Sequence, residues 1–487
     1  MIIEYIVIVL YSFSLLFIFM FSLGQLHLTW HYLKSKKGKS TFPATQVHTP
    51  KVTVQLPVFN EKYVIDRLID AVCQFDYPKE LLEVQVLDDS TDDTIEIAAQ
   101  KIAYWSAQGI DITHIRRQER VGFKAGALEY GLHLAKGEFI AIFDSDFLPK
   151  PDFLLRTLSE FNEDIGLVQT RWGHLNRDYS LLTRLQAFGL DAHFSIEQTG
   201  RSHAGSFINF NGTGGVWRKD TIIDAGGWSS DTLTEDLDLS YRAQIKGWKF
   251  KFLEDCVAPA ELPVIMPAIK SQQYRWNKGA AETAKKNLGK VFRSKINWLN
   301  KIHAVFHLFN SSVFVCLLLA SILSIPMLYI KDANPELSLL FDLGSIFLIG
   351  FFSIAVFYWI SSKNTFKDKA ASQYIKVFPM FLVVSMGLSL HNGLAVLEGL
   401  LGVKSAFVRT PKFNIKHRGD SWKGNEYVKP SFTLLTFLEG VLCLYFIGGI
   451  AAGIHLHDWG LIIFHVMLAL GFGSVFYHSV KPIRNVA

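Results

Sequence analysis

Two pairs of acidic residues stand directly after strand-like runs of apolar residues. Asp88-Asp89 ends the run 84–87, and Asp144-Ser145-Asp146 ends the run 139–143. Carboxylates just past the ends of buried parallel strands lie where open α/β sheets bind ligands. Two acids spaced i, i+2 can share a hard divalent cation, which in turn grips a diphosphate. A lone Asp-x-Asp is more often an ordinary acidic turn, but the strand before it and the acidic pair upstream favour a metal site and an enzyme acting on a sugar nucleotide.

A third acidic group, Thr234-Glu235-Asp236, opens a segment of helical character. Transfer of a sugar with inversion needs one base to take the proton of the acceptor hydroxyl. A carboxylate does this when it is partly desolvated beside the acceptor. Asp236 and Glu235 both qualify, and ordinary helix capping by Thr234 explains the same pattern equally well.

A planar amide, a fixed cation and a large aromatic ring follow within five residues, as Gln272, Arg275 and Trp276. On a helix Gln272 and Arg275 share a face, so Arg275 can hold a leaving diphosphate while Trp276 stacks on a sugar ring. A membrane-proximal helix with interfacial Trp and Arg is the competing interpretation. Lys124, in the segment 122–128, is either a phosphate or base contact or a solvated lysine at a helix start. Four other tryptophans could line the bottom of an acceptor groove, although most such rings belong to the core. They are Trp172, Trp217, Trp228 and Trp248.

The composition divides the chain into a charged block and apolar flanks. The 487 residues are 49% hydrophobic and 19% charged, with a net charge of +5, and most of the charge lies between Lys34 and Lys301. This charge indicates a positive-inside bias at a membrane rather than nucleic-acid binding. The cysteines are far apart and have no metal-ligand spacing, which predicts buried or lipid-facing thiols in a reducing cytosol: Cys73, Cys256, Cys316 and Cys443.

Strand-like and helical runs alternate from Val52 to about Ile142, which predicts βαβ units and a parallel sheet. Outside this block, several apolar runs reach the roughly 20 residues that a bilayer needs. The first run precedes a cluster of lysines, which indicates an anchor with its C-terminal end in the cytosol. The expected spans are Tyr5–Leu28, His303–Ile330, Leu337–Ile360, Phe432–Leu456 and Trp459–Val480.

A further apolar run, Val377–Gly402, is interrupted by His391-Asn392 and Glu398. The loops on both sides of it, 361–376 and 404–429, are basic and are therefore both expected in the cytosol. A single crossing would place one of them outside. This run is therefore predicted to be interfacial or re-entrant at the cytosolic surface.

Taken together, the motifs resemble those of the family-2 inverting, processive glycosyltransferases of the cellulose synthase superfamily, closest to the cellulose-synthase-like (gluco)mannan and glucan synthases. The resemblance covers roughly Val52 to Lys412, with D, DxD, TED and QxxRW in order. It rests also on the segments 56–61, 86–92, 122–128, 168–172, 210–218 and 272–279.

The resemblance implies an α/β GT-A-like fold with a Rossmann-like mixed sheet, set in the cytosol between transmembrane helices. It implies that Asp236 is the general base, and that Asp144 and Asp146 hold the diphosphate with Mg²⁺ or Mn²⁺. The implied nucleotide and diphosphate contacts are Asn60, Glu61, Asp88, Lys124, Asp144, Gln272, Arg275 and Trp276. The implied acceptor contacts are Asn211, Gly212, Thr213 and Trp276. The implied gating loop, which closes over the nucleotide, contains Phe407, Thr410 and Lys412.

The expected activity is a hexosyltransferase that polymerises GDP-mannose or UDP-glucose into a β-1,4-linked glycan and extrudes it. Its expected partners are the donor, a polysaccharide acceptor and the bilayer of a plasma or inner membrane; no nucleic-acid partner is expected. The alternatives are a non-processive transferase that adds one sugar to a membrane lipid, and a catalytically idle scaffold or export channel. The expected domains are an anchor (1–33), a cytosolic transferase (40–300), two spans (303–360), an interfacial segment with the gating-like loop (361–431) and two further spans (432–480).

Overall fold

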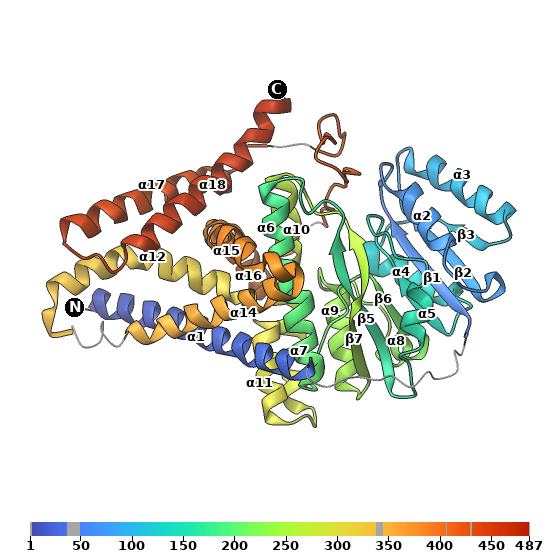
Figure 1. Ribbon diagram of the computed structural model, residues 1–487, viewed down its shortest axis with the longest axis horizontal. Coiled ribbons are helices and arrows are strands. Elements are labelled where there is room, and N and C mark those ends of the chain that lie inside the picture. Colours follow the sequence, from blue (N-terminus) through green and yellow to red (C-terminus); the bar gives the residue numbers. More distant parts are fainter. Residues whose placement is uncertain (1, 37–48, 338–343, 406, 429–430, 487) are drawn as a thin grey trace.

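The computed structural model describes residues 2–36, 49–337, 344–405, 407–428 and 431–486. The first residues of the expected catalytic domain, from residue 40 to residue 48, lie outside the described residues. The charged block and the apolar flanks form two distinct halves, with the sheet at one end and the long apolar helices at the other (Figure 1).

The centre of the charged half is a seven-stranded mixed sheet in the order β3-β2-β1-β4-β6-β5-β7. The neighbours of β1 run parallel to it, and β6 runs antiparallel to both β4 and β5. The strands are β1 Val52–Val58, β2 Leu82–Asp88, β3 Asp111–Ile115, β4 Phe139–Ile142, β5 Ile165–His174, β6 Gly215–Arg218 and β7 Lys249–Ala260. The predicted α/β fold with a parallel-dominated mixed sheet is confirmed.

Strands β1, β2 and β4 are buried almost throughout, as expected for strands covered on both faces. Helices cover the sheet and lead away from it. They are α2 Ile65–Cys73, α3 Thr94–Ala107, α4 Phe123–Leu134, α5 Phe153–Leu158, α6 Leu181–Ala192, a π-helical turn at His193–Glu197, α7 Gln198–His203, α8 Lys219–Asp224, α9 Glu235–Ile245 and α10 Met266–Arg293. A 3₁₀ turn, Lys79–Leu81, precedes β2.

The apolar half consists of helices that precede or follow this domain in the sequence. They are α1 Ile2–Ser35, α11 Trp298–Leu308, α12 Ser312–Ala333, α14 Leu348–Phe366, α15 Ala370–Gly387, α16 Ser389–Leu401, α17 Leu434–His455 and α18 Ile462–Val486. Short 3₁₀ turns occur at Pro335–Leu337, Gly344–Phe347 and Lys367–Lys369.

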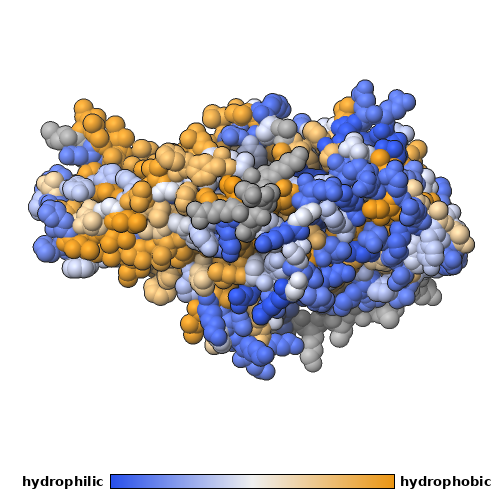
Figure 2. All heavy atoms as spheres, turned by 90° about the horizontal axis from the view of Figure 1, so that it is seen from above, coloured by the Kyte–Doolittle hydropathy of each residue, from blue (hydrophilic) through white to orange (hydrophobic). Residues whose placement is uncertain are grey.

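Five helical stretches of the described chain are long and apolar enough to span a membrane. They are Ile2–Ser35, Ser312–Ala333, Leu348–Gly387, Leu434–His455 and Ile462–Ile483. Large apolar side chains on their outer faces are exposed, for example Val9 and Phe13 on α1 and Leu444 on α17. On the face drawn in Figure 2, hydrophobic residues predominate over much of this half. Exposed apolar surface on helices that are long enough to span a bilayer indicates contact with lipid. The chain is an integral membrane protein.

Two of the expected apolar segments are each divided between two helices. The run that starts at His303 is divided into α11 and α12, and Val377–Gly402 is divided between the end of α15 and all of α16. Of these, α16 packs against α10 and α12. Because α10 carries Gln272 and Arg275, α16 joins the membrane helices to the catalytic half. The interfacial position of residues 377–402 stays a prediction.

Candidate active site

The carboxyl ends of β1, β2 and β4 face two adjoining cavities, which we name by one residue of each. The Glu61 cavity is also lined by Asp89, Arg120 and Arg409. The Asp236 cavity is also lined by Trp172, His174, Gln272 and Trp276. Six residues line both cavities, so the two form one cleft: Lys124, Asp144, Asp146, Arg275, Phe407 and Lys412. The acids and cations predicted from four separate motifs therefore converge at one place.

Asp144 and Asp146 follow β4, in the turn where that strand ends. Lys124 Nζ lies 2.6 Å from Asp144 Oδ1, and Lys412 Nζ lies 2.8 Å from Asp146 Oδ2. The backbone N–H of Asp144 donates to Thr213 Oγ1 at 2.9 Å. The Oδ1 atom of Asp146 is buried and has no hydrogen-bond partner in the described structure, so it is free to become a metal ligand.

Among the described residues, no three His, Cys, Asp or Glu side chains form a metal-binding cluster. Mg²⁺ is commonly held by one or two carboxylates together with substrate phosphates rather than by a complete protein cage. The Asp144–Asp146 pair with its unpaired oxygen fits such a site. A metal bound there would offset the charge of a departing diphosphate.

Asp236 lies in the first turn of α9, next to Glu235. The Asp236 carboxyl group is held close to the backbone turn at Gly212, where a Cβ atom would lie 3.0 Å from Asp236 Oδ2 and 3.4 Å from Lys124 Nζ. Gly212 has φ of +78°, which L side chains rarely adopt. This turn lets the backbone approach Asp236 and Lys124 closely.

Burial raises the pKa of Asp236, and the neighbouring Glu235 carboxylate raises it further. The positive end of α9 and the Lys124 cation favour the ionised form but do not outweigh burial. A carboxyl group with a raised pKa is suited to accept a proton from a hydroxyl near neutral pH. Thr234 occupies the N-cap position without capping the helix through its side chain, and its hydroxyl instead contacts that of Thr283 at 3.1 Å.

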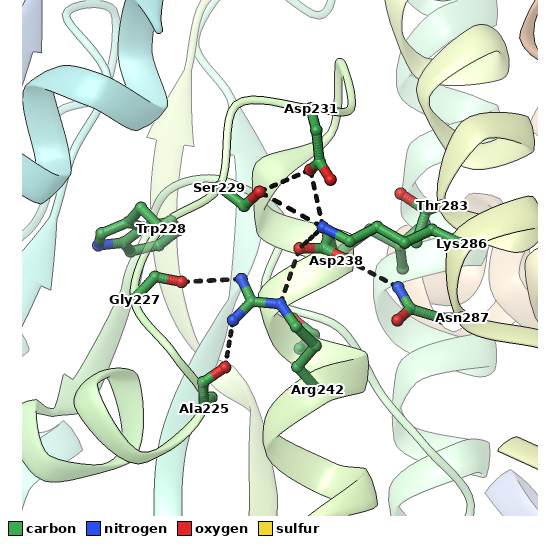
Figure 3. Close-up of polar contacts among 12 residues, drawn as sticks. Ala225, Gly227, Trp228, Ser229, Asp231, Asp238, Arg242, Thr283, Lys286 and Asn287 are labelled. Atoms are coloured by element: carbon green, nitrogen blue, oxygen red, sulfur yellow. Dashed lines mark hydrogen bonds and ion pairs between the residues drawn. The ribbon is translucent and has the colours of Figure 1, made fainter. Parts of the chain in front are cut away.

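A buried polar network holds α9 against α10 (Figure 3). The centre of the network is Asp238, which is fully buried. Its Oδ2 accepts from Arg242 Nε at 2.8 Å and from Lys286 Nζ at 3.0 Å, and its Oδ1 accepts from Asn287 Nδ2 at 2.8 Å. Arg242 also donates to the carbonyl oxygens of Ala225 and Gly227. The network fixes α9, which carries Asp236, relative to α10, which carries Gln272, Arg275 and Trp276.

Those three residues occupy consecutive turns of α10 and line the Asp236 cavity, as the i, i+3 spacing of Gln272 and Arg275 predicts. Arg275 Nη2 donates to Thr410 Oγ1 at 2.8 Å, and its guanidinium lies 4.9 Å from the ring centre of Phe407. The ring centres of Trp276 and Trp172 are 6.5 Å apart. The platform therefore combines a cation with two aromatic rings.

The loop from Phe407 to Lys412 closes over the cleft from the C-terminal part of the chain. Phe407 stacks on Phe123, with ring centres 5.5 Å apart. Arg409 Nη1 lies 3.0 Å from Glu61 Oε1. Burial raises the pKa of Glu61 to about 7, although Arg409 and Lys412 oppose this shift. In this conformation, the loop places its own cations on acids that line the cleft.

Two predicted nucleotide contacts lie beside the cleft rather than among its lining residues. Asp88 is buried, with its Oδ2 2.8 Å from His114 Nε2 and its Oδ1 accepting from Ser90 N. Asn60 accepts from Thr91 N at 2.8 Å and holds the same turn. Asp89 is the acid of this pair that lines the cleft, where Arg117 binds both of its carboxylate oxygens.

The predicted acceptor turn, Asn211-Gly212-Thr213, lies between the acids and β5. Asn211 Oδ1 accepts from Asn209 Nδ2 at 2.9 Å and contacts His193 Nε2 at 3.3 Å. The Thr213 carbonyl accepts from Gln169 Nε2 at 3.1 Å. Asn211 and Gly212 line the Asp236 cavity, while Thr213 is buried behind it and bonds to Asp144.

The lining residues that were not singled out from the sequence include Arg409, His174 and Glu261. Arg409 pairs with Glu61, and His174 lies at the end of β5. Glu261 accepts from the backbone N–H groups of Phe413 and Asn414 at 2.9 and 3.0 Å, so it anchors the far end of the loop. Arg409 stands within the motif 407–412 and carries a detectable signal there. Glu261 and His174 carry none, because their role depends on which distant segments pack beside them.

Comparison with known proteins is consistent with this geometry. A profile of the family described as "Glycosyltransferase like family 2" matches residues 50–298. Glucomannan 4-beta-mannosyltransferase 1 of Oryza sativa subsp. japonica is 41% identical over 305 residues, which are 59% of this chain and 57% of that protein. Glucomannan 4-beta-mannosyltransferase 2 of Arabidopsis thaliana is 36% identical over 417 residues, covering 80% of this chain and 70% of that protein.

Among solved structures, the mannosyltransferase PcManGT from Pyrobaculum calidifontis, in complex with GDP-Man and Mn²⁺, superposes with a TM-score of 0.55. It is 18% identical, and the match covers 81% of this chain and all of that one. The likeness supports the GT-A-like fold. The predicted family is confirmed by the sequence relatives: the chain belongs to glycosyltransferase family 2, among its cellulose-synthase-like members.

Proposed function

We propose that this protein is a membrane-embedded inverting glycosyltransferase that transfers mannose from GDP-mannose to a β-1,4-linked mannan or glucomannan. The observation that carries the proposal is the convergence of Asp236, the Asp144–Asp146 pair and the Gln272–Trp276 platform in one cleft. The names of the two plant relatives, and the GDP-Man and Mn²⁺ bound to PcManGT, support mannose and a divalent cation. UDP-glucose is the competing donor.

In this proposal the acceptor hydroxyl lies beside Asp236, and the donor's anomeric carbon faces it. The hydroxyl oxygen forms the new bond to that carbon as the bond to the nucleotide phosphate breaks, and Asp236 takes the hydroxyl proton. Attack from the face opposite the leaving group converts an α-linked donor into a β-linked product. In this proposal Arg275 and Lys124 hold the departing diphosphate, which is supported by their shared place in the lining of the cavity and by the contact of Lys124 with Asp144.

Asp144 and Asp146 would hold Mg²⁺ or Mn²⁺, which supplies positive charge at the diphosphate. Lys412 contacts Asp146 Oδ2 at 2.8 Å, so a cation bound through the unpaired Oδ1 would place a second positive charge beside the lysine and weaken its hold on this carboxylate. The diphosphate offers that lysine a new anionic partner. Gating by the loop 407–412 follows from this exchange.

The basic loops around α15 and before α17 support a cytosolic position for the transferase domain. The acceptor platform lies on α10, which packs against α16 and contacts α18. A growing chain held at Trp276 would therefore face the membrane helices. Extrusion through them is part of the proposal.

The test is incorporation of radiolabel by purified protein in detergent, with GDP-mannose and UDP-glucose supplied separately. Digestion of the product with linkage-specific hydrolases identifies the sugar and the linkage. We expect a size ladder of β-1,4-mannan that requires a divalent cation and is abolished by a chelator. A discrete glycolipid would instead identify a single-addition enzyme, and absence of turnover with either donor would refute the proposal.

A further inference from the structure

His174 stands at the carboxyl end of β5 and lines the Asp236 cavity together with Trp172 and Gln272. Its side chain is almost wholly enclosed, with 2% of its surface exposed. A histidine in this position either packs in the core or binds the molecule that occupies the cavity. The hydrogen bonds around the ring distinguish the two.

One ring nitrogen of His174 is held by a buried acid. Its Nε2 lies 3.1 Å from Oδ1 of Asp191, in the last turn of α6. Asp191 Oδ2 lies 2.7 Å from Arg177 Nη2. Burial by itself would raise the pKa of Asp191, but the contacts with His174 and Arg177 together hold it below its usual value. A carboxylate oxygen can only accept, so in this contact His174 Nε2 is the donor and Nδ1 is the ring nitrogen left for a ligand.

A neutral imidazole that carries its proton on Nε2 presents Nδ1 as a hydrogen-bond acceptor. Within the described part of the chain, no protein group hydrogen-bonds to His174 Nδ1, although Asp191 holds the ring firmly. A fixed acceptor of this kind in a cavity wall beside two tryptophan rings is suited to a sugar hydroxyl. The rings supply the stacking surface, and the nitrogen supplies direction.

We propose that His174 is an acceptor-binding residue, whose Nδ1 accepts a hydrogen bond from a hydroxyl of the acceptor saccharide held against Trp276. Asp191 and Arg177 are positioning residues, which fix the tautomer and the orientation of the ring. The proposal rests on the proposed glycosyl transfer and adds a residue to its acceptor side. It predicts that His174 affects recognition of the acceptor and leaves binding of the nucleotide unchanged.

Two substitutions separate this role from a structural one, because the side chains of Gln and Asn each mimic a different ring nitrogen. His174→Gln places its terminal amide near the position of Nε2, so it keeps the contact with Asp191 and removes the group at Nδ1. His174→Asn places its amide near Nδ1 and removes the contact with Asp191. His133→Ala is a matched control, since His133 is 73% exposed on α4 and lines neither cavity of the cleft.

The assay measures transfer from GDP-mannose to a soluble β-1,4-mannooligosaccharide, with the donor and the acceptor varied in turn. Loss of one hydrogen bond should raise the acceptor KM of His174→Gln roughly 3- to 10-fold. Its donor KM and its affinity for GDP with Mn²⁺ should stay within about twofold of the wild type. His174→Asn should have an acceptor KM closer to the wild type and a lower Tm.

An unchanged acceptor KM in His174→Gln would overturn the proposal, and so would equal losses of acceptor and GDP binding in both variants. A wild-type protein that transfers sugar from no donor would refute the proposed function itself. The two failures are therefore distinguishable. The Tm of each variant, measured in detergent with GDP and Mn²⁺, shows whether it is folded.

Discussion

Replacement of Asp236 by asparagine tests the catalytic proposal most directly, because the change removes the base with little change in shape. The asparagine side chain would retain an oxygen to accept from Leu237 N, which donates to Asp236 Oδ1 at 2.8 Å. The substitution would also remove a buried negative charge beside Glu235. We therefore expect D236N to fold. Loss of a positioned general base lowers kcat by about 10²- to 10⁴-fold, equivalent to about 2.7–5.4 kcal/mol of transition-state stabilisation.

The raised pKa of Asp236 also fixes the sign of two pH effects. Activity should be low when the carboxyl is protonated and should rise with pH through the raised value. A folded-state pKa above the unfolded value means that ionisation costs free energy of folding. The protonated Asp236 carboxyl group therefore stabilises the folded protein relative to its ionised form. This contribution to the free energy of unfolding is present at acid pH, below the ordinary carboxylate pKa, and is lost as the pH rises through the raised pKa. The Tm of D236N relative to the wild type should therefore increase with pH over this range.

The measurement is kcat for radiolabel transfer, with thermal unfolding of both proteins at several pH values. E235Q is the matched comparison, since Glu235 is also buried in the first turn of α9 and its pKa is raised by the same burial. If E235Q loses at least as much activity as D236N, Glu235 is the base. If D236N retains wild-type kcat, the assignment of the cleft as a transferase site is wrong.

Three further predictions concern residues that support this site. Lys412→Met should free the Asp146 carboxylate and strengthen Mn²⁺ binding by about 3- to 10-fold, measured by calorimetry without nucleotide. Its kcat should fall because the loop loses a cation. Unchanged metal affinity would contradict the exchange proposed above. Gly212→Ala should lower the free energy of unfolding by about 1–3 kcal/mol, since φ is +78° and the new Cβ would press on Asp236. Chemical denaturation should show this loss, and kcat should fall as well. Gly289→Ala is the control, because a Cβ there meets nothing, and it should change neither quantity. Asp238→Asn should leave Lys286 and Arg242 without their buried anion and lower stability by roughly 3–5 kcal/mol; a Tm equal to that of the wild type would show that the network of Figure 3 does not hold α9 in place.

The sequence predicts the acidic centre of the cleft well because local rules govern it. Asp144 and Asp146 follow a buried strand, and parallel strands end at a common edge. The platform is equally local, since Gln272 and Arg275 lie one turn apart on one helix. These rules act within a few residues and need no knowledge of the tertiary structure.

Residues whose surroundings come from distant segments could not be predicted in this way. Which acid of the Asp88–Asp89 pair faces the cleft depends on His114, which lies on the neighbouring strand β3 and binds Asp88. Glu261 becomes a loop anchor only because Phe413 and Asn414 pack beside it. The division of 377–402 at Leu388 likewise cannot be predicted from composition, which indicates only one apolar run interrupted by polar residues.

The contacts of the loop 407–412 couple the charged groups of the cleft to one another. Lys412 and Arg409 neutralise Asp146 and Glu61, two buried acids whose charges would otherwise be uncompensated. A divalent cation alone would compete with Lys412 for Asp146 and leave the lysine without a partner. If the cation entered with a nucleotide diphosphate, Lys412 could leave Asp146 for the phosphate oxygens, and Asp146 would remain neutralised by the cation. Metal and donor should therefore bind with positive coupling, and the loop should remain closed in the loaded state, held by the diphosphate instead of by the protein's own carboxylates.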